Sequence, residues 1–346
     1  MRFEKIVFFG ASVTAQKTTA DGVVSGYFPN LEVLLRDACG PNLEIHRFGF
    51  VGSHFDSAAN MCLFEIEHLL GEKTLLVSEW HTTTLPRFDD RALRAYFKRV
   101  SETGASVLNL VLPMVSCIEK ERTNIRQTRS AQGEGVWQLN LYKSDLDLGK
   151  CIRDEQHTTP FGGKAYAKYI FDALQRIFSG AGLARDEGEE ISFWEGTSQY
   201  PEMAFEALEG TFLPGTRIKL EIPKSLRKRE VQIFSKVAKG PETAQLYIHA
   251  GGEVHIFDTW NRYTYYRHKW STFGPISPSL TLPPGVNTAV IEVTNNLPDY
   301  VALSRGLEKP IAYMAKMKPH TKSLSLVGGI YLLGAADFSL SLQSSE

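Results

Sequence analysis

The sequence has few cysteines, no long apolar run and no excess of charge of either sign, and each absence excludes a class of protein. Only four of the 346 residues are cysteines, too few and too scattered for a disulfide scaffold. No two of them form a CxxC pair, so a structural zinc site is not expected. No apolar stretch approaches the roughly 18 residues of a membrane-spanning helix. The 38 Lys and Arg balance the 39 Asp and Glu, which argues against nucleic acid as a partner.

The remaining composition is that of a soluble globular protein. Hydrophobic residues make up 43% of the chain and charged residues 22%, both near the globular average. A chain of this length is expected to form two domains. The apolar run that begins at Ile6 stops at Gly10, which is too short for the core of a signal peptide. We therefore expect a cytoplasmic protein that does not associate with membranes.

Short apolar runs alternate with segments of helical periodicity in the first half of the chain. Strands are expected at 5–9, 43–48, 74–77, 106–112 and 137–141, and helices at 31–38, 57–70, 89–100 and 166–178. Gly71 is expected to cap the second of these helices. This rhythm predicts a parallel sheet covered by helices on both faces. Ligands of such sheets bind beyond the carboxyl ends of the strands.

The pattern changes near residues 180–190, where the chain reads GAGLARDEGEE. Beyond this point short strand-like runs follow one another, punctuated by Pro and Gly, at 217–222, 231–234, 245–249, 254–257, 279–282, 288–293 and 324–333. Such spacing predicts an antiparallel β-sandwich or jelly roll. The expected organisation is an α/β domain at 1–182, a linker at 183–190 and an all-β domain at 191–346.

Two segments are candidates for binding. Asp258 to Trp270 in the β-rich domain is dense in aromatic and basic residues. Its aromatic side chains would stack on sugar rings or anchor a partner; alternatively, they simply alternate between the sandwich core and solvent. The β-rich domain is therefore a candidate carbohydrate- or partner-binding domain and a candidate route to oligomers. The long charged loop between Pro113 and Trp137 is either a substrate-contacting segment or a solvated excursion.

A serine and a histidine stand where nucleophilic chemistry would need them. Ser12 lies in a turn directly after the first predicted strand, so its hydroxyl is expected to be exposed there. A serine hydroxyl needs an adjacent base, and His157 supplies an imidazole that Asp154 would orient. The alternatives are an ordinary capping turn at Ser12 and a surface loop at Asp154 to His157.

Two further strand ends are candidates for the same site. Gly52, shortly after the second predicted strand, is placed to offer a backbone N–H to a developing oxyanion, unless it serves only the turn. Polar groups follow the third predicted strand at Ser78 and Glu79. Trp80 and His81 come next and are candidates for substrate contact.

Two other functional motifs, a phosphate-binding loop and a metal site, are only partly matched by the sequence. Gly10 to Thr18 loosely matches a phosphate-binding loop, but the second glycine is absent and Lys17 comes one position late. Glu65 and His68 share a predicted helix without a second histidine at helical spacing, so no metal site is expected. We therefore expect neither a metal nor another cofactor.

The serine, glycine and histidine segments together resemble the SGNH, or GDSL-type, hydrolase family. Three blocks carry the resemblance, in the order and spacing of the family: Gly10-Ala11-Ser12-Val13-Thr14 for G-D-S-x-T, Gly49-Phe50-Val51-Gly52 for G-x-x-G, and Asp154-Glu155-Gln156-His157 with Thr159 and Gly162 or Gly163 for D-x-x-H-x-T-x-x-G. The resemblance implies a flavodoxin-like α/β/α fold. It also implies Ser12 as nucleophile, His157 as general base and Asp154 as its orienter, with the N–H groups of Ser12 and Gly52 in the oxyanion hole.

The sequence departs from the family pattern at two positions. Ala11 replaces an Asp of the first block that is not the catalytic acid. By position, Glu79 replaces the Asn of the third block, whose side chain donates to the oxyanion. An ionised carboxylate has no proton to donate. Either Glu79 is protonated, or another group such as His81 donates, or the alignment is shifted, or hydrolysis is inefficient.

The function expected from these residues is that of a serine esterase. The substrate would be a small acylated molecule, an acetylated carbohydrate in the first instance. Two alternatives stay open. One is a polysaccharide O-acetyltransferase, and the other is a catalytically impaired SGNH-like protein that binds a glycan or a partner.

Overall fold

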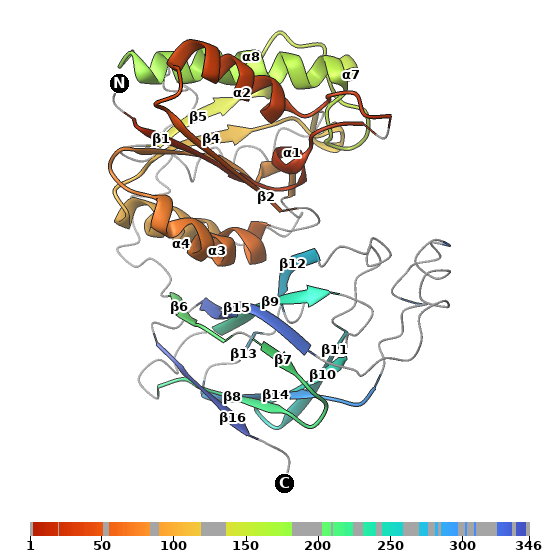
Figure 1. The fold of residues 1–346 in the computed structure, drawn as a ribbon. Helices are drawn as coiled ribbons and strands as arrows, with labels where there is room; N and C mark the ends of the chain where they lie inside the picture. Colours follow the sequence, from red (N-terminus) through yellow and green to blue (C-terminus); the bar gives the residue numbers. More distant parts are fainter. Residues whose placement is uncertain are drawn as a thin grey trace. The chain divides into compact units, whose positions relative to one another are not determined.

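The structure is a computed structural model that divides the chain into two compact units, Met1–Tyr200 and Pro201–Glu346 (Figure 1). It describes residues 3–19, 21–50, 55–83, 90–118, 136–181, 203–208, 210–223, 231–239, 244–258, 270–275, 281–282, 285–296, 302, 308, 324–333 and 337–343. The predicted linker at 183–190 lies outside the described residues, and the two domain boundaries stay predictions.

A parallel sheet forms the centre of the first unit. Its described strands are β1 (Lys5–Gly10), β2 (Glu44–Gly49), β3 (Thr74–Glu79), β4 (Ser106–Val111) and β5 (Val136–Asn140), in the order β2-β1-β3-β4-β5. The strands β3 and β4 in the middle of the sheet are buried at every residue, whereas β2 at the edge is partly exposed. This is the flavodoxin-like order, and the chain reverses direction across the sheet between β1 and β3.

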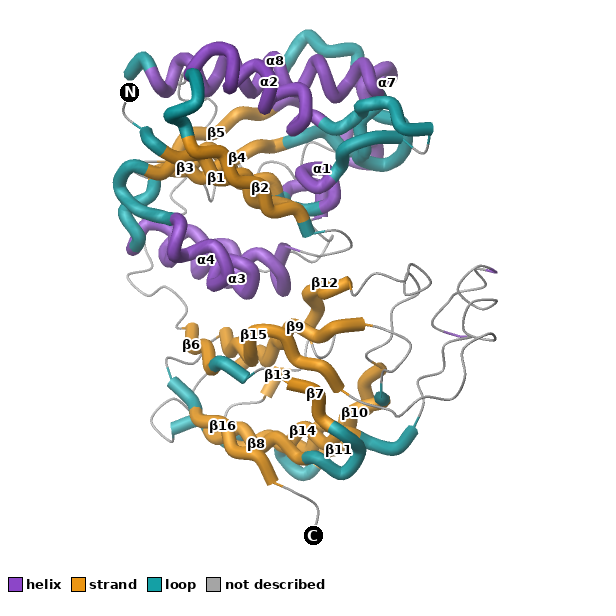
Figure 2. The backbone as a smooth tube through the Cα atoms, viewed as in Figure 1, coloured by secondary structure: helices purple, strands orange, loops and turns teal. Residues whose placement is uncertain are grey.

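Helices cover both faces of this sheet, as predicted (Figure 2). On one face lie α2 (Tyr27–Cys39) and α8 (Pro160–Phe178), which pack together, and on the other lie α3 (Phe55–Ile66) and α4 (Asp90–Glu102). The short elements are α1 (Ser12–Ala15), α5 (Val115–Ile118), α7 (Leu148–Cys151), and the 3₁₀ turns η1 (Glu67–Leu69), η2 (His81–Thr83) and η3 (Leu141–Lys143). No helix in the described part of the chain is long and apolar enough to cross a membrane.

Three predicted helix boundaries are wrong by four residues or more, the start of α2 at Tyr27 among them, and the other two have clear local reasons. The helix expected at 57–70 ends at Ile66, because the chain tightens into the 3₁₀ turn η1, closed by the bond from Leu70 N–H to Glu67 O. Gly71 is therefore not its cap. The last helix begins six residues earlier than expected, at Pro160. The Thr159 side chain caps it by accepting from Gly162 N–H at 3.0 Å, and proline suits the first helical position.

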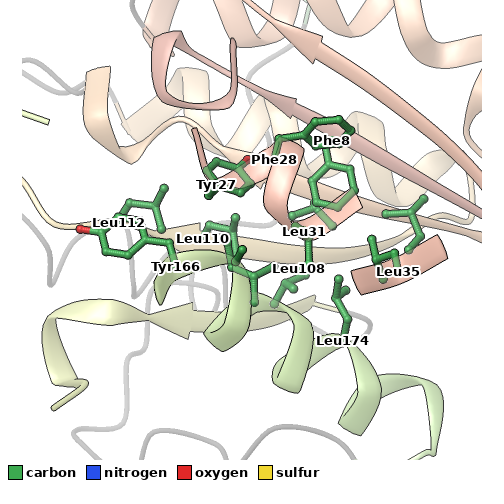
Figure 3. Close-up of a cluster of buried hydrophobic side chains, with 14 of the residues drawn as sticks. Phe8, Tyr27, Phe28, Leu31, Leu35, Leu108, Leu110, Leu112, Tyr166 and Leu174 are labelled. Carbon is green, nitrogen blue, oxygen red and sulfur yellow. The ribbon is translucent and has the colours of Figure 1, made fainter. Parts of the chain in front are cut away.

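One layer of the core of the first unit lies between the sheet and the helices α2 and α8 (Figure 3). Phe8 of β1 meets Phe28 of α2 edge to face, with ring centroids 5.0 Å apart. Leu108 of β4 and Leu174 of α8 are also completely buried in this cluster. Because the layer buries large apolar side chains from both ends of the unit's sequence, it ties α8 to the strands that carry the site.

The second unit is a β-sandwich, in agreement with the predicted class. One sheet has the order β11-β10-β14-β8-β16, and the other has β12-β9-β15-β6, with β13 paired to β9 and β7 to β15. The described strands are β6 (Met203–Glu206), β7 (Gly210–Phe212), β8 (Arg217–Glu221), β9 (Val231–Lys239), β10 (Gln245–Ala250), β11 (Glu253–Asp258), β12 (Trp270–Pro275), β13 (Thr281–Leu282), β14 (Thr288–Val293), β15 (Leu324–Leu333) and β16 (Ser339–Gln343). Buried residues of both sheets, such as Ile248 and Leu332, share one core.

Two segments singled out in the sequence fall mostly outside the described residues. Within Asp258 to Trp270, the structure describes only the two end residues, which close β11 and open β12. In the long charged loop, residues 119–135 lie outside the description. The proposed binding roles of both segments stay predictions.

Candidate active site

Ser12 lies at the switch point of the sheet, directly after β1. It opens α1, and the residue is buried, with 7% of its surface exposed, whereas the sequence predicted an exposed serine. The ends of β1 and β3 approach closely here, because Ala11 N–H donates to Glu79 O at 3.0 Å. A methyl group at Gly10 would overlap that same Glu79 oxygen, which explains the need for glycine at this position. The close approach fixes where Ser12 leaves the sheet.

The loop between α7 and α8 brings His157 and Asp154 to Ser12. The His157 Nε2 atom lies 3.1 Å from Ser12 Oγ. On the other side of the ring, His157 Nδ1 lies 3.0 and 3.1 Å from the two Asp154 carboxyl oxygens. Side chains that stand 145 positions apart in the sequence therefore form one continuous line of hydrogen bonds.

The surroundings of Asp154 keep its carboxyl group ionised. Partial burial by itself raises its pKa, but the backbone N–H groups of His157 and Gln156 and the adjacent imidazole outweigh it and lower the pKa to about 2. An ionised Asp154 accepts a hydrogen bond from the N–H at His157 Nδ1. The Nε2 atom then carries the lone pair and can accept a hydrogen bond from the Ser12 hydroxyl.

A buried glutamine holds the histidine loop against the segment that follows Ser12. Gln16 Nε2 donates to Ser25 Oγ at 2.8 Å and to Thr158 O at 2.9 Å, and Gln16 Oε1 accepts from Thr158 N–H at 3.1 Å. Thr158 is completely buried. Because Thr158 follows His157 directly, this contact limits how far the imidazole moves from Ser12. The sequence offered no signal for this role of Gln16.

A second glutamine that the sequence analysis did not single out touches Ser12 itself. Gln156 Nε2 lies 3.1 Å from Ser12 Oγ. Gln156 is one of the two unspecified positions of the D-x-x-H block, so its type carried no signal. Only the folded loop shows that its side chain turns toward Ser12.

Glu79, the last residue of β3, is completely buried and hydrogen-bonded through both carboxyl oxygens. Its Oε1 accepts from Thr82 Oγ1 at 2.6 Å, and its Oε2 accepts from Thr14 Oγ1 at 2.9 Å and from Thr14 N–H at 3.2 Å. Tyr27 OH joins the same network 2.9 Å from Thr14 Oγ1. Burial raises the pKa of Glu79 to about 7, against the opposing effect of these hydrogen bonds. Glu79 thus titrates near neutral pH while it ties α1 to the end of β3.

We expect Glu79 to make the folded first unit less stable as the pH rises. The native pKa of about 7 exceeds the ordinary value of 4.5, so between these values the folded state holds a proton that the unfolded state releases. The free energy of unfolding should fall by on the order of 3 kcal/mol across this range. In Glu79→Gln that decline should be absent, as measured by urea denaturation at a series of pH values.

The exposed Glu102 of α4 provides the matched control for this measurement. Glu102→Gln should keep the pH dependence of the wild type. A Glu79→Gln protein whose unfolding free energy declines with pH as steeply as the wild type's would show that Glu79 does not titrate as described.

Three other residues predicted for the site are Gly52, Trp80 and His81. Gly52 lies outside the described residues. Trp80 is 2% exposed, with its ring centroid 5.2 Å from that of Phe9. His81 is 3% exposed and lies edge-on to the ring of Tyr142 at 5.8 Å. Both residues are almost completely buried and offer little surface to a substrate. Their contact with substrate stays a prediction. Among the described residues, no three or more His, Cys, Asp and Glu gather as they would around a metal ion.

No protein-family model matches the sequence, and no curated protein matches it. Solved structures do match. The chain is similar to the crystal structure of a two-domain esterase (CEX) active on acetylated mannans, with 12% identity, a TM-score of 0.58, and coverage of 94% of this chain and 90% of that one. It is similar as well to the same esterase co-crystallised with mannopentaose, with 12% identity, a TM-score of 0.56, and coverage of 94% and 89%.

This likeness establishes the fold. The chain has a flavodoxin-like α/β/α domain followed by a β-rich domain, as the sequence predicted. The chain shares this fold with the two-domain esterase active on acetylated mannans, over about nine-tenths of both chains.

Proposed function

We propose that the protein is a serine esterase that removes an acetyl group from a carbohydrate. The observation that carries the proposal is the hydrogen-bonded line from Ser12 through His157 to Asp154, placed at the switch point of a parallel sheet. A hydroxyl, an imidazole and a carboxylate in this order are what acyl transfer requires, and ligands of such sheets bind at this point.

In the proposed reaction, Ser12 Oγ attacks the ester carbonyl carbon and its proton passes to His157 Nε2. Asp154 holds the resulting imidazolium. The tetrahedral intermediate collapses, the sugar hydroxyl leaves with the proton from His157, and the acyl group stays on Ser12. Water then attacks the acyl-enzyme, His157 takes the water's proton and returns it to Ser12 Oγ, and acetate is released.

Backbone donors are proposed for the oxyanion of the intermediate. Ser12 is the first residue of α1, where a backbone N–H has no acceptor within the helix. Gly52 N–H is the second proposed donor, from the G-x-x-G block. Glu79 stands where the family's third donor is expected, but its carboxyl group is buried and engaged with Thr14 and Thr82. We therefore do not assign the oxyanion to Glu79.

The acetylated carbohydrate is proposed from the fold. The two-domain esterase with the same fold acts on acetylated mannans, and the likeness includes the β-rich second domain. A β-sandwich joined to an esterase domain suits the binding of an extended glycan, although a fold alone does not fix a ligand. Acetylated mannan is accordingly the first substrate to test.

The test measures acetate released from acetylated mannan and acetylated xylan, together with covalent labelling by a fluorophosphonate probe. We expect acetate release and a single labelled residue, Ser12, identified by mass spectrometry. Labelling without acetate release, but with acetyl transfer from an activated donor to a glycan, would indicate the transferase. An absence of both labelling and turnover would exclude serine acyl chemistry and leave glycan binding as the function to test.

A further inference from the structure

The side-chain amide of Gln156 contacts Ser12, the proposed nucleophile. Ser12 Oγ has two neighbours at 3.1 Å, His157 Nε2 and Gln156 Nε2. The hydroxyl has one proton, and this proton goes to His157. The contact with Gln156 is therefore one in which the amide N–H donates and Ser12 Oγ accepts. Gln156 thus brings a neutral donor to the atom that attacks.

Glu79 leaves the site without the side-chain donor that the SGNH pattern places at its position. Both of its carboxyl oxygens accept hydrogen bonds from Thr14 and Thr82, and the residue is completely buried. A carboxyl group held in this way offers no N–H to a substrate. Any third donor to an oxyanion has to come from another element.

We propose that Gln156 supplies this donor, so that the oxyanion hole takes its side-chain amide from the histidine loop rather than from the end of β3. The proposal rests on the proposed esterase function. After attack, Ser12 Oγ and the oxyanion are bonded to the same carbon, closer together than the length of a hydrogen bond. A small rotation of the Gln156 side chain carries an N–H from Oγ to the oxyanion as negative charge develops there.

The loop holds Gln156 in place for this task. Its own backbone N–H donates to Asp154 Oδ1 at 3.0 Å. The preceding residue, Glu155, accepts from Val115 N–H at 2.9 Å through its backbone oxygen and from Ser116 N–H at 3.1 Å through its side chain. Donors fixed in advance stabilise a transition state without the cost of reorganisation. The loop that orients the base therefore also positions the donor.

The experiment compares three proteins: Gln156→Glu, which keeps the shape but replaces the N–H donor by a negative charge, Gln156→Ala, which removes the donor without adding a charge, and the wild type. For phenyl acetate we expect kcat to fall by about 10²–10³-fold in both variants, with KM changed only a few-fold. Gln175→Glu, the same change at an exposed position of α8, should keep wild-type kinetics.

A thiono substrate separates oxyanion stabilisation from simple positioning of Ser12. Phenyl thionoacetate develops its charge on sulfur, a weak acceptor, so an oxyanion donor favours the oxygen ester over it. If Gln156 donates to the oxyanion, both Gln156 variants should lose its share of this preference and keep the share that the backbone N–H groups of Ser12 and Gly52 supply. If Gln156 only positions Ser12, the two substrates should slow equally, which would overturn the proposal.

The outcomes also separate this proposal from the proposed function. An active, Ser12-dependent wild type with an equally active Gln156→Glu variant would overturn the role of Gln156 and leave the esterase standing. A wild type that neither turns over esters nor labels at Ser12 would overturn both.

Discussion

Replacing Ser12 by alanine should lower kcat for acetyl esters by about 10⁴-fold or more. Ser12 Oγ is the atom that lies within hydrogen-bonding distance of both His157 and Gln156, and the alanine side chain has no atom to attack the carbonyl. The protein should still fold, because the substitution removes one partly accessible oxygen and leaves no cavity in the core. Steady-state hydrolysis of p-nitrophenyl acetate, with acetate release from acetylated mannan in parallel, measures the effect.

Ser101→Ala is the matched control for this prediction. Ser101 is exposed at the end of α4, where its hydroxyl donates to Lys98 O, so the same loss of a hydroxyl should leave kcat unchanged. If Ser12→Ala retained a tenth or more of the wild-type kcat, Ser12 would not be the nucleophile. The residual turnover would then have to come from another group.

Replacing Phe8 by alanine should destabilise the first unit by about 3–5 kcal/mol. Phe8 is completely buried in the middle of β1 and meets Phe28 at 5.0 Å, so the smaller side chain leaves a cavity between the sheet and α2. Phe8 and Phe28 belong to the cluster of buried side chains that fills this layer (Figure 3). Urea denaturation followed by a signal of the first unit measures the change in unfolding free energy.

Phe161→Ala makes the same chemical change at an exposed position. Phe161 is 56% exposed near the start of α8, and substitutions at such positions usually change stability by less than about 0.5 kcal/mol. Equal effects of the two substitutions would mean that β1 does not lie in the core of the first unit.

The elements of the sheet could be predicted because their sequences carry one dominant signal. The apolar runs of β1, β3 and β4 are buried on both faces, so their sequences do not alternate between apolar and polar residues, and they end abruptly at Gly10, Ser78 and Pro113. The sequence also places Ser12 after the first strand of a parallel sheet. Ser12 was therefore expected at the edge where ligands bind, and the structure places it there.

Other features of the site depend on contacts that no local pattern encodes. Gln156 occupies a position where any residue would satisfy the motif, and only the turn of the loop aims its amide at Ser12. Glu79 looked like a charge at a strand end, and its burial follows from the closeness of Thr14 and Thr82 in the fold. The edge strand β16 was missed because its alternating Ser and Leu are mostly exposed and resemble a polar tail.

The distance along the chain between Ser12 and His157 also determines when the site forms during synthesis. Ser12 follows β1, whereas β3, β4 and the loop before α8 leave the ribosome later. In the folded unit α8 packs beside α2, and Thr158, just before α8, contacts Gln16. A nascent chain that ends before His157 carries the serine without its proposed base. Ester hydrolysis by ribosome-bound chains of increasing length would therefore begin only once the last helix of the first unit has left the exit tunnel, and its onset would report completion of that unit.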